Sequence, residues 1–127
     1  MKKVISTEKA PKAIGPYSQA IETEDFIFIS GQLPINPKTQ EMPDEVGKQT
    51  KYCLENIKAI LNSCGLDLNN IVKTTVYMTD LTKFPIMNEV YATYFNDKPP
   101  ARATVEVKAL PKGAMIEIET IAVKNKV

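Results

Sequence analysis

The stretch that decides the fold is residues 99–123, which read PPARATVEVKALPKGAMIEIETIAV. Two runs within it, residues 101–107 and 115–123, are rich in β-branched side chains, and the break between them contains Pro111 and Gly113. Such runs predict β-strands, because branched side chains fit a pleated surface, whereas proline and glycine favour the turn between them. We therefore expect the chain to end in two extended strands joined by a short loop.

Side chains alternate across a strand, so the pattern places Arg102, Thr104 and Glu106 on one face of the first run. The two prolines that precede Arg102 restrict the backbone and so fix the direction in which this side chain leaves the strand. A guanidinium held in one direction is a candidate clamp for a carboxylate or a phosphate. An interstrand ion pair of Arg102 with Glu106, Glu117 or Glu119 is the alternative interpretation.

The rest of the chain contains four further predicted strands and two predicted helices. The strands are expected at residues 3–6, 16–21 (a sheet edge), 26–30 (ended by Gly31) and 71–78, and the helices at residues 44–64 and 83–96. Asp44 and Thr82 are the expected N-caps, and Gly65 is the expected stop of the first helix. This order predicts one α+β domain over residues 1–127, a mixed sheet with both helices packed on one face. Because several strands are apolar on both sides, we expect another subunit to cover the second face.

The composition excludes several function classes. The 16 basic and 15 acidic residues nearly balance and form no basic run, so neither nucleic acid nor a membrane is expected as a partner. The absence of histidine rules out His-activated nucleophiles and His-containing zinc sites, and we expect no metal and no cofactor. The N-terminus has no apolar signal core and no stretch reaches transmembrane length, which predicts a cytoplasmic location.

The two cysteines, Cys53 and Cys64, fall in the first predicted helix. A rise of about 1.5 Å per residue separates them by about 16 Å, which is too far for a disulfide bond. Both lie on or beside the apolar face of that helix, so we interpret them as core residues. Two unpaired thiols are also typical of a reducing compartment.

The C-terminal stretch resembles the signature of the RidA family, also called YjgF-like proteins, at Pro100 to Ala103, Val105, Leu110 and residues 116–118. The resemblance continues through IGPYSQAI (residues 14–21), ISGQLPINPKT (residues 29–39), KTTVYMTDL (residues 73–81) and Asn88 with Tyr91, so it covers essentially the whole chain. It implies a chorismate-mutase-like α+β fold that assembles as a homotrimer with clefts between its subunits.

The resemblance also implies an activity. RidA-like proteins hydrolyse 2-imino acids to 2-keto acids and ammonia, and the imino acids arise from enamines such as 2-aminoacrylate, which pyridoxal-phosphate enzymes release. Arg102 would grip the substrate carboxylate, and Glu117 would position or activate the attacking water. The implied catalytic residues are Arg102, Glu117 and Tyr17, and the implied substrate-binding residues are Ser30, Gly31, Asn88, Arg102 and Thr104.

Thr104 departs from the family pattern, because many members carry cysteine at this position. Threonine supplies no thiolate, so a mechanism with a sulfur nucleophile is ruled out, whereas attack by water is not. The alternative functions are a non-catalytic trimeric regulator that binds small carboxylates, a translation inhibitor or chaperone-like stress protein, and a chorismate mutase. The presence of both Arg102 and Glu117 favours the deaminase, because a carboxylate sensor needs only the arginine.

Overall fold

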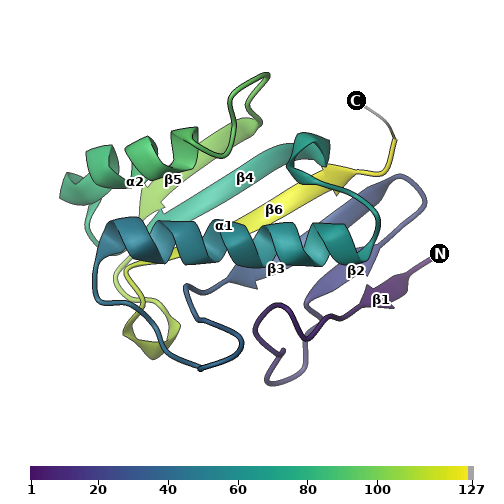
Figure 1. The fold of residues 1–127 in the computed structure, drawn as a ribbon, viewed down its shortest axis with the longest axis horizontal. Helices are drawn as coiled ribbons and strands as arrows, with labels where there is room; N and C mark the ends of the chain where they lie inside the picture. The colour runs from purple at the N-terminus through teal and green to yellow at the C-terminus, as the bar shows by residue number, and fades with distance from the viewer. Residues whose placement is uncertain (126–127) are drawn as a thin grey trace.

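The computed structural model describes residues 1–125 and shows one six-stranded sheet with two helices (Figure 1). The strands are β1 (Lys3–Ile5), β2 (Ala20–Glu22), β3 (Phe26–Gln32), β4 (Ile71–Met78), β5 (Ala101–Glu106) and β6 (Ile116–Val123). Their order across the sheet is β1-β2-β3-β6-β4-β5. β4 and β5 run parallel and all other neighbours run antiparallel, so the prediction of a mixed α+β sheet is confirmed.

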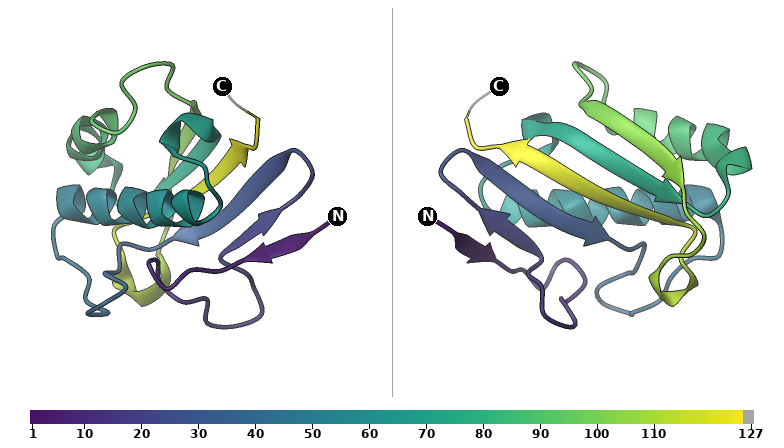
Figure 2. Two further views of the ribbon diagram at one scale, coloured as in Figure 1. Left: turned by 45° about the vertical axis from the view of Figure 1, so that its right-hand side comes forward. Right: turned by 180° about the vertical axis from the view of Figure 1, so that it is seen from behind.

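The two helices, α1 (Val46–Ser63) and α2 (Phe84–Ala92), lie on the same face of the sheet. α1 crosses the middle of the sheet, and α2 lies beside it over β4 and β5 (Figures 1 and 2). α2 belongs to the connection between the parallel strands β4 and β5, which a hairpin turn cannot join. The packing of both helices on one face is therefore as predicted.

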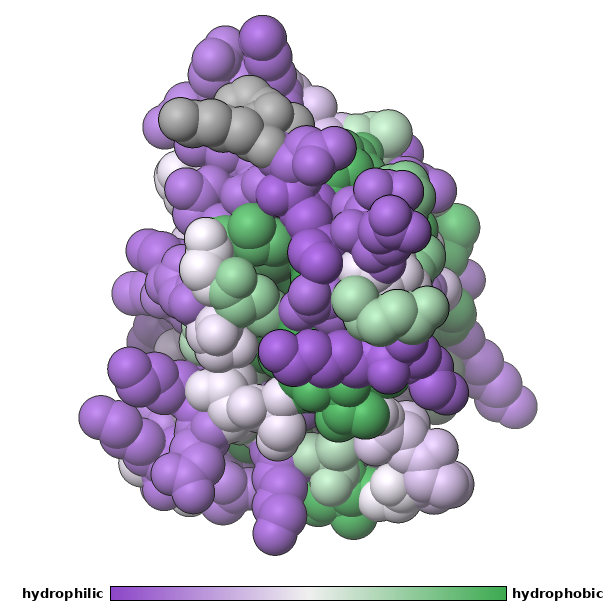
Figure 3. Space-filling view, turned by 90° about the vertical axis from the view of Figure 1, so that its right-hand side faces the viewer, coloured by the Kyte–Doolittle hydropathy of each residue, from purple (hydrophilic) through white to green (hydrophobic). Residues whose placement is uncertain are grey.

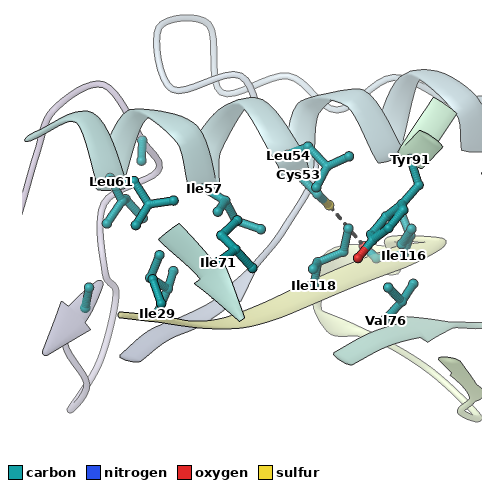
Figure 4. Close-up of a cluster of buried hydrophobic side chains, with 14 of the residues drawn as sticks. Ile29, Cys53, Leu54, Ile57, Leu61, Ile71, Val76, Tyr91, Ile116 and Ile118 are labelled. Carbon is teal, nitrogen blue, oxygen red and sulfur yellow. Dashed lines mark hydrogen bonds between the residues drawn. The ribbon is translucent and has the colours of Figure 1, made fainter. Parts of the chain in front are cut away.

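The hydrophobic core lies between α1 and the sheet (Figure 4). Leu54, Ile57 and Leu61 of α1 follow helical spacing and belong to this core together with Ile116 and Ile118 of β6, and all five side chains are fully buried. Burial of each such side chain stabilises the fold by about 1.5–3 kcal/mol. The pattern of one apolar helix face against alternate residues of a strand is the one that the sequence predicts.

The start of α1 differs from the prediction by one residue. Its N-cap is Glu45 and not Asp44. The Glu45 side chain is long enough to fold back on the first turn, where its carboxylate accepts hydrogen bonds from the backbone N–H groups of Gly47 (2.6 Å) and Lys48 (3.1 Å).

α2 is shorter than the predicted helix at residues 83–96. Its N-cap is Lys83, which makes no side-chain capping bond, whereas Thr82 donates its backbone N–H and its hydroxyl hydrogen to Asp80. The prediction of Thr82 as the cap is therefore wrong. The helix ends at Ala92 because the next two backbone N–H groups bond to carbonyls only three residues back, which tightens the last turn.

Three strands, β1, β5 and β6, are each one residue shorter than predicted, and β2 and β3 differ more. The segment at residues 16–21 does not begin as a strand, because Gly15 has a φ of 114° and its carbonyl accepts the Tyr17 N–H at 2.9 Å in a tight turn. β2 starts only at residue 20 and lies inside the sheet, with β1 at the edge. β3 does not end at Gly31 but continues to Gln32 through a β-bulge.

No helix of the described chain, residues 1–125, covers the second face of the sheet (Figure 2). Phe26 and Phe28 of β3, with ring centres 6.0 Å apart, and Val105 of β5 each leave about two-fifths of their surface exposed, at 39%, 44% and 40%. On the side of the molecule that carries the termini, hydrophobic residues show between hydrophilic ones (Figure 3). Within residues 1–125 no helix is both long and apolar enough to cross a bilayer.

Gly65 stops α1 as predicted. Its φ is 77°, and the N–H groups of Gly65 and Leu66 reach back to the carbonyls of Asn62 and Leu61 at 3.1 and 2.9 Å. Apart from Gly65 and its two chain neighbours, no atom of residues 1–125 lies within 4 Å of the place that a Cβ would take, so a substitution is opposed only by the left-handed backbone.

We expect Gly65→Ala to lower the free energy of unfolding by about 1 kcal/mol, because an L-residue is strained in this conformation. Gly65→Asn is the matched control and should lose less, since asparagine tolerates left-handed backbone. Urea unfolding of the three proteins measures the difference. Equal losses for the two variants would contradict this account of the helix stop.

Candidate active site

Arg102 lies on β5, at one edge of the sheet, and its side chain turns toward α2. Its guanidinium Nη1 donates to Oδ1 of Asn88 at 2.9 Å. The guanidinium carbon lies 4.8 Å from the centre of the Tyr91 ring and 5.4 Å from that of Phe84. Within residues 1–125 no carboxylate lies within ion-pair distance of Arg102, so the alternative of an interstrand ion pair is wrong.

The guanidinium keeps most of its hydrogen-bonding capacity. Arginine carries five N–H donors in a fixed fork, and the bond to Asn88 uses one of them. Free donors of this kind suit a planar carboxylate, which can accept two parallel hydrogen bonds. Thr104 lies two residues along the same face, but its hydroxyl oxygen is buried and finds no hydrogen-bond partner among residues 1–125.

Glu117 lies on the opposite face of the sheet. Its neighbours along β6, Ile116 and Ile118, are fully buried on the helix side, so the alternation of side chains turns Glu117 away from the helices. It lies against Gly31, in the β-bulge of the neighbouring strand β3. A Cβ at position 31 would come within 2.7 Å of Glu117 Oε2, so glycine leaves the room that the carboxylate occupies.

Glu117 and Gly31 line a pocket of about 590 Å³ together with Ser30 and Tyr17. The Ser30 hydroxyl donates to the carbonyl of Ser18 at 2.6 Å, and the Tyr17 hydroxyl accepts the N–H of residue 14 at 3.3 Å. Tyr17 leaves about half of its surface exposed, at 53%. The wall of the pocket thus carries one carboxylate, an exposed tyrosine, a serine and a glycine backbone.

The structure therefore places the predicted site residues in two groups. The pocket group consists of Tyr17, Ser30, Gly31 and Glu117, and the arginine group consists of Asn88, Arg102 and Thr104. The two groups lie on opposite faces of one sheet, because the arginine group faces α2 whereas Glu117 faces away from the helices. A single chain does not bring Arg102 beside Glu117.

The surroundings of Glu117 affect its protonation. Burial, and after it the negative charge of Glu119 on the same face of β6, raises the pKa of Glu117 above its ordinary value. Tyr77 of β4 donates its hydroxyl hydrogen to Glu119 and keeps that carboxylate beside Glu117. A carboxylate with a raised pKa accepts a proton more readily than an ordinary glutamate does. Glu117 is therefore suited to accept a proton and return it.

Buried amide side chains hold the loops around the pocket group, and nothing in the sequence marks them as functional. Gln19 accepts the N–H of Thr7 at 2.8 Å and donates to the carbonyls of Thr7 at 3.0 Å and Pro11 at 2.8 Å. Asn56 of α1 donates to two carbonyls of the loop after β3, at 3.1 and 2.9 Å. The sequence shows only that Asn56 is a polar residue on the apolar face of α1, three residues after the buried Cys53 and four before the buried Ile60.

The prediction of core cysteines is confirmed for Cys53, whereas Cys64 lies at the border of the core. Cys53 is fully buried, its Sγ donates to the carbonyl of Ile116 at 3.8 Å (Figure 4), and burial raises the pKa of the thiol well above its ordinary value. Cys64 is half-buried and packs against the core. Within the described residues, no three Cys, Asp or Glu side chains gather closely enough to bind a metal ion.

Comparison with known proteins gives consistent matches over the whole chain. A family model described as endoribonuclease L-PSP matches residues 7–124. A RutC family protein of Pyrococcus horikoshii is 57% identical over 126 residues, which make up 98% of this chain and 100% of the relative. A Mus musculus protein named 2-iminobutanoate/2-iminopropanoate deaminase is 50% identical over 126 residues, or 98% of this chain and 93% of the relative.

Solved structures agree with these matches. The YjgF gene product of Escherichia coli has a TM-score of 0.94 and 48% identity, and E. coli TdcF with bound serine has a TM-score of 0.94 and 44% identity. Each comparison covers 97% of this chain and 99% of the other. By its fold, this chain is an α+β protein with one mixed sheet and both helices on one face of that sheet. The chain belongs to the RidA family of YjgF-like proteins.

We expect Glu119→Gln to lower the pKa of Glu117, because the substitution removes the like charge beside it. The glutamine keeps an acceptor for the Tyr77 hydroxyl, so the packing should change little. Burial should still hold the pKa of Glu117 above the ordinary glutamate value. Carbon-13 NMR titration of the carboxyl groups measures the shift, with Glu24→Gln in the exposed β2–β3 turn as control. A shift of similar size in both variants would contradict the local origin of the effect.

Proposed function

We propose that this protein is a 2-iminobutanoate/2-iminopropanoate deaminase, which hydrolyses reactive imino acids to 2-keto acids and ammonia without a metal or a cofactor. The observation that carries the proposal is the half-buried Glu117, held against Gly31 on a pocket wall with a raised pKa. The name of the mouse relative supports this substrate class. The serine bound to the E. coli TdcF structure also supports a site for small amino-acid-like molecules.

Arg102 is the proposed binding group for the substrate carboxylate. An imino acid of this class carries one planar carboxylate, which matches the free donors of the guanidinium. The Asn88 amide holds one edge of the guanidinium and leaves the others available. Binding of the carboxylate places the imine carbon at a fixed distance from the rest of the site, which favours attack by a positioned water.

Glu117 is the proposed proton carrier. Water adds to the carbon of the protonated imine to give a neutral carbinolamine while Glu117 accepts one of the water protons. The same carboxyl group returns that proton to the nitrogen. The C–N bond then breaks, the hydroxyl proton passes to the departing ammonia, and the 2-keto acid and ammonium leave. Water is the nucleophile throughout, so this route works with Thr104 where many relatives carry cysteine.

Tyr17, Ser30 and Gly31 are proposed to orient the substrate from the wall of the same pocket. Tyr17 and Ser30 line the pocket with Glu117, and the β-bulge brings Gly31 to the same wall. The non-catalytic regulator of small carboxylates is the second candidate. Arg102 and Asn88 alone would satisfy it, whereas the position and raised pKa of Glu117 have no role in it.

A homotrimer is proposed because the two groups of site residues lie on opposite faces of one chain. The cleft would form where the arginine group of one subunit meets the pocket group of the next. A cyclic arrangement repeats this contact between every pair of neighbours. The exposed Phe26, Phe28 and Val105 on the uncovered sheet face supply apolar surface for such an assembly.

The cytoplasmic location and the absence of nucleic-acid partners stay predictions.

We expect Arg102→Lys to lower kcat/KM for 2-iminobutyrate by about 30-fold to 1000-fold, or roughly 2–4 kcal/mol of transition-state binding. Lysine keeps the charge but loses the two-pronged donor that fits a carboxylate. The substrate is generated in situ by a dehydratase, and keto acid release is followed with and without the protein. Melting temperature and oligomeric state are measured in parallel. Near-normal hydrolysis by a well-folded variant would remove Arg102 from the site.

A mixing experiment tests the shared cleft. We expect Arg102→Ala and Glu117→Gln each to be nearly inactive alone, because each removes one half of every site. When the two variants are unfolded, mixed in equal amounts and refolded, about a quarter of the clefts should combine an intact Arg102 with an intact Glu117. Each variant refolded alone is the control. Absence of recovered activity in verified mixed trimers would contradict a site shared between subunits.

A further inference from the structure

Two aromatic rings and one amide of α2 surround the guanidinium of Arg102. Phe84, Asn88 and Tyr91 are spaced four and three residues apart, so they form one stripe along the helix. The stripe faces β5, since the guanidinium carbon lies 4.8 Å from the centre of the Tyr91 ring and 5.4 Å from that of Phe84. Asn88 lies between the rings and accepts the Nη1 hydrogen bond. One helix face thus supplies both ring contacts and the hydrogen bond to the guanidinium.

The Tyr91 ring is fixed at both ends. Its backbone belongs to α2, and its hydroxyl shares a hydrogen bond of 2.8 Å with the Thr74 hydroxyl on β4. The side chain is only 5% exposed and also contacts the ring of Phe95, with ring centres 4.7 Å apart. Thr74 is the residue that the parallel register places opposite Arg102. The ring under the guanidinium is therefore tied to the strand that neighbours β5.

We propose that Tyr91, anchored by its hydroxyl bond to Thr74, is a positioning residue that holds the Arg102 guanidinium ready for the substrate carboxylate. The inference rests on the proposed function, in which Arg102 binds that carboxylate. A cation over an aromatic face is attracted by the electron-rich ring. A guanidinium that is already oriented loses less freedom when it forms two hydrogen bonds to an anion. Tyr91 acts through Arg102 and need not touch the substrate.

If Tyr91 served packing alone, the effect of replacing it would depend on residue 102 in a different way than if it positions Arg102. A packing residue affects stability and activity in the same way whichever side chain occupies position 102. A positioning residue loses its effect once the side chain that it positions has been replaced. A double-mutant cycle between positions 91 and 102 separates the two roles.

The first experiment measures this cycle in hydrolysis of 2-iminobutyrate by the full-length protein. Tyr91→Leu removes the ring, and we expect it to lower kcat/KM by about 10-fold in the Arg102 background, mainly through KM. In the Arg102→Lys background the same change should lower kcat/KM by less than about 2-fold. Equal losses in both backgrounds, or no loss in either, would overturn the proposal.

The second experiment leaves the ring in place, so it remains informative if Tyr91→Leu fails to fold. Tyr91→Phe and Thr74→Val each break the hydroxyl bond, and each should raise KM by about 3-fold with little change in kcat. The double variant should resemble the single ones, because both remove the same bond. Tyr94→Phe is the matched control, since it removes a hydroxyl bond of 2.7 Å to Glu55 that does not involve Arg102. An unchanged KM in all three variants of positions 74 and 91 would overturn the proposal.

Calorimetric binding of 2-oxobutanoate, the keto acid product, separates this inference from the proposed function. Wild-type protein that hydrolyses 2-iminobutyrate should bind the product, and Tyr91→Phe should bind it about 3-fold more weakly. Full affinity in Tyr91→Phe and Thr74→Val, alongside normal wild-type hydrolysis, would overturn the positioning role alone. A wild-type protein with neither hydrolysis nor binding would overturn both the function and the inference.

Discussion

The pairing of β6 with both β3 and β4 is the interaction on which the rest of the structure depends. β6 is the last strand in the chain but lies in the middle of the sheet, where it joins the strands that precede α1 to those that follow it. Ile116 and Ile118 on one side of β6 contact the core under α1, whereas Glu117 and Glu119 lie on the other side. A slip of one residue would turn both glutamates into the core, so the register is strongly determined.

Local patterns in the sequence predict most of the elements. β-branched runs mark the strands, an apolar helical face that includes Cys53 marks α1, and Gly65 marks its end, because these features depend on residues close together in the chain. The element boundaries that differ from the prediction are set by particular hydrogen bonds. A sequence pattern does not show which of two neighbouring groups will form such a bond. Glu45 replaces Asp44 as the cap of α1, and the turn at Gly15 delays the start of β2.

The site could be predicted only as a set of residues and not as an arrangement. Alternation assigns faces within each strand, but which face lies under the helices is decided by pairing with distant strands. Arg102 turns toward α2 and Glu117 turns away from it, which neither strand reveals alone. The structural roles of Gln19 and Asn56 could not be predicted for a related reason. Their side chains bond to backbone groups of loops that lie several residues away in the sequence and come close only in the folded chain.

The contact between Gly31 and Glu117 also couples the evolution of two positions that are distant in the sequence. A mutation that gives residue 31 a side chain displaces the carboxylate, and shortening the acid at position 117 moves the same oxygens. If Glu117 carries the proton as proposed, selection on the hydrolysis acts on both positions at once. Lineages of such a protein should therefore either keep the pair together or lose it together, and a descendant that has lost both would mark a branch with a different task.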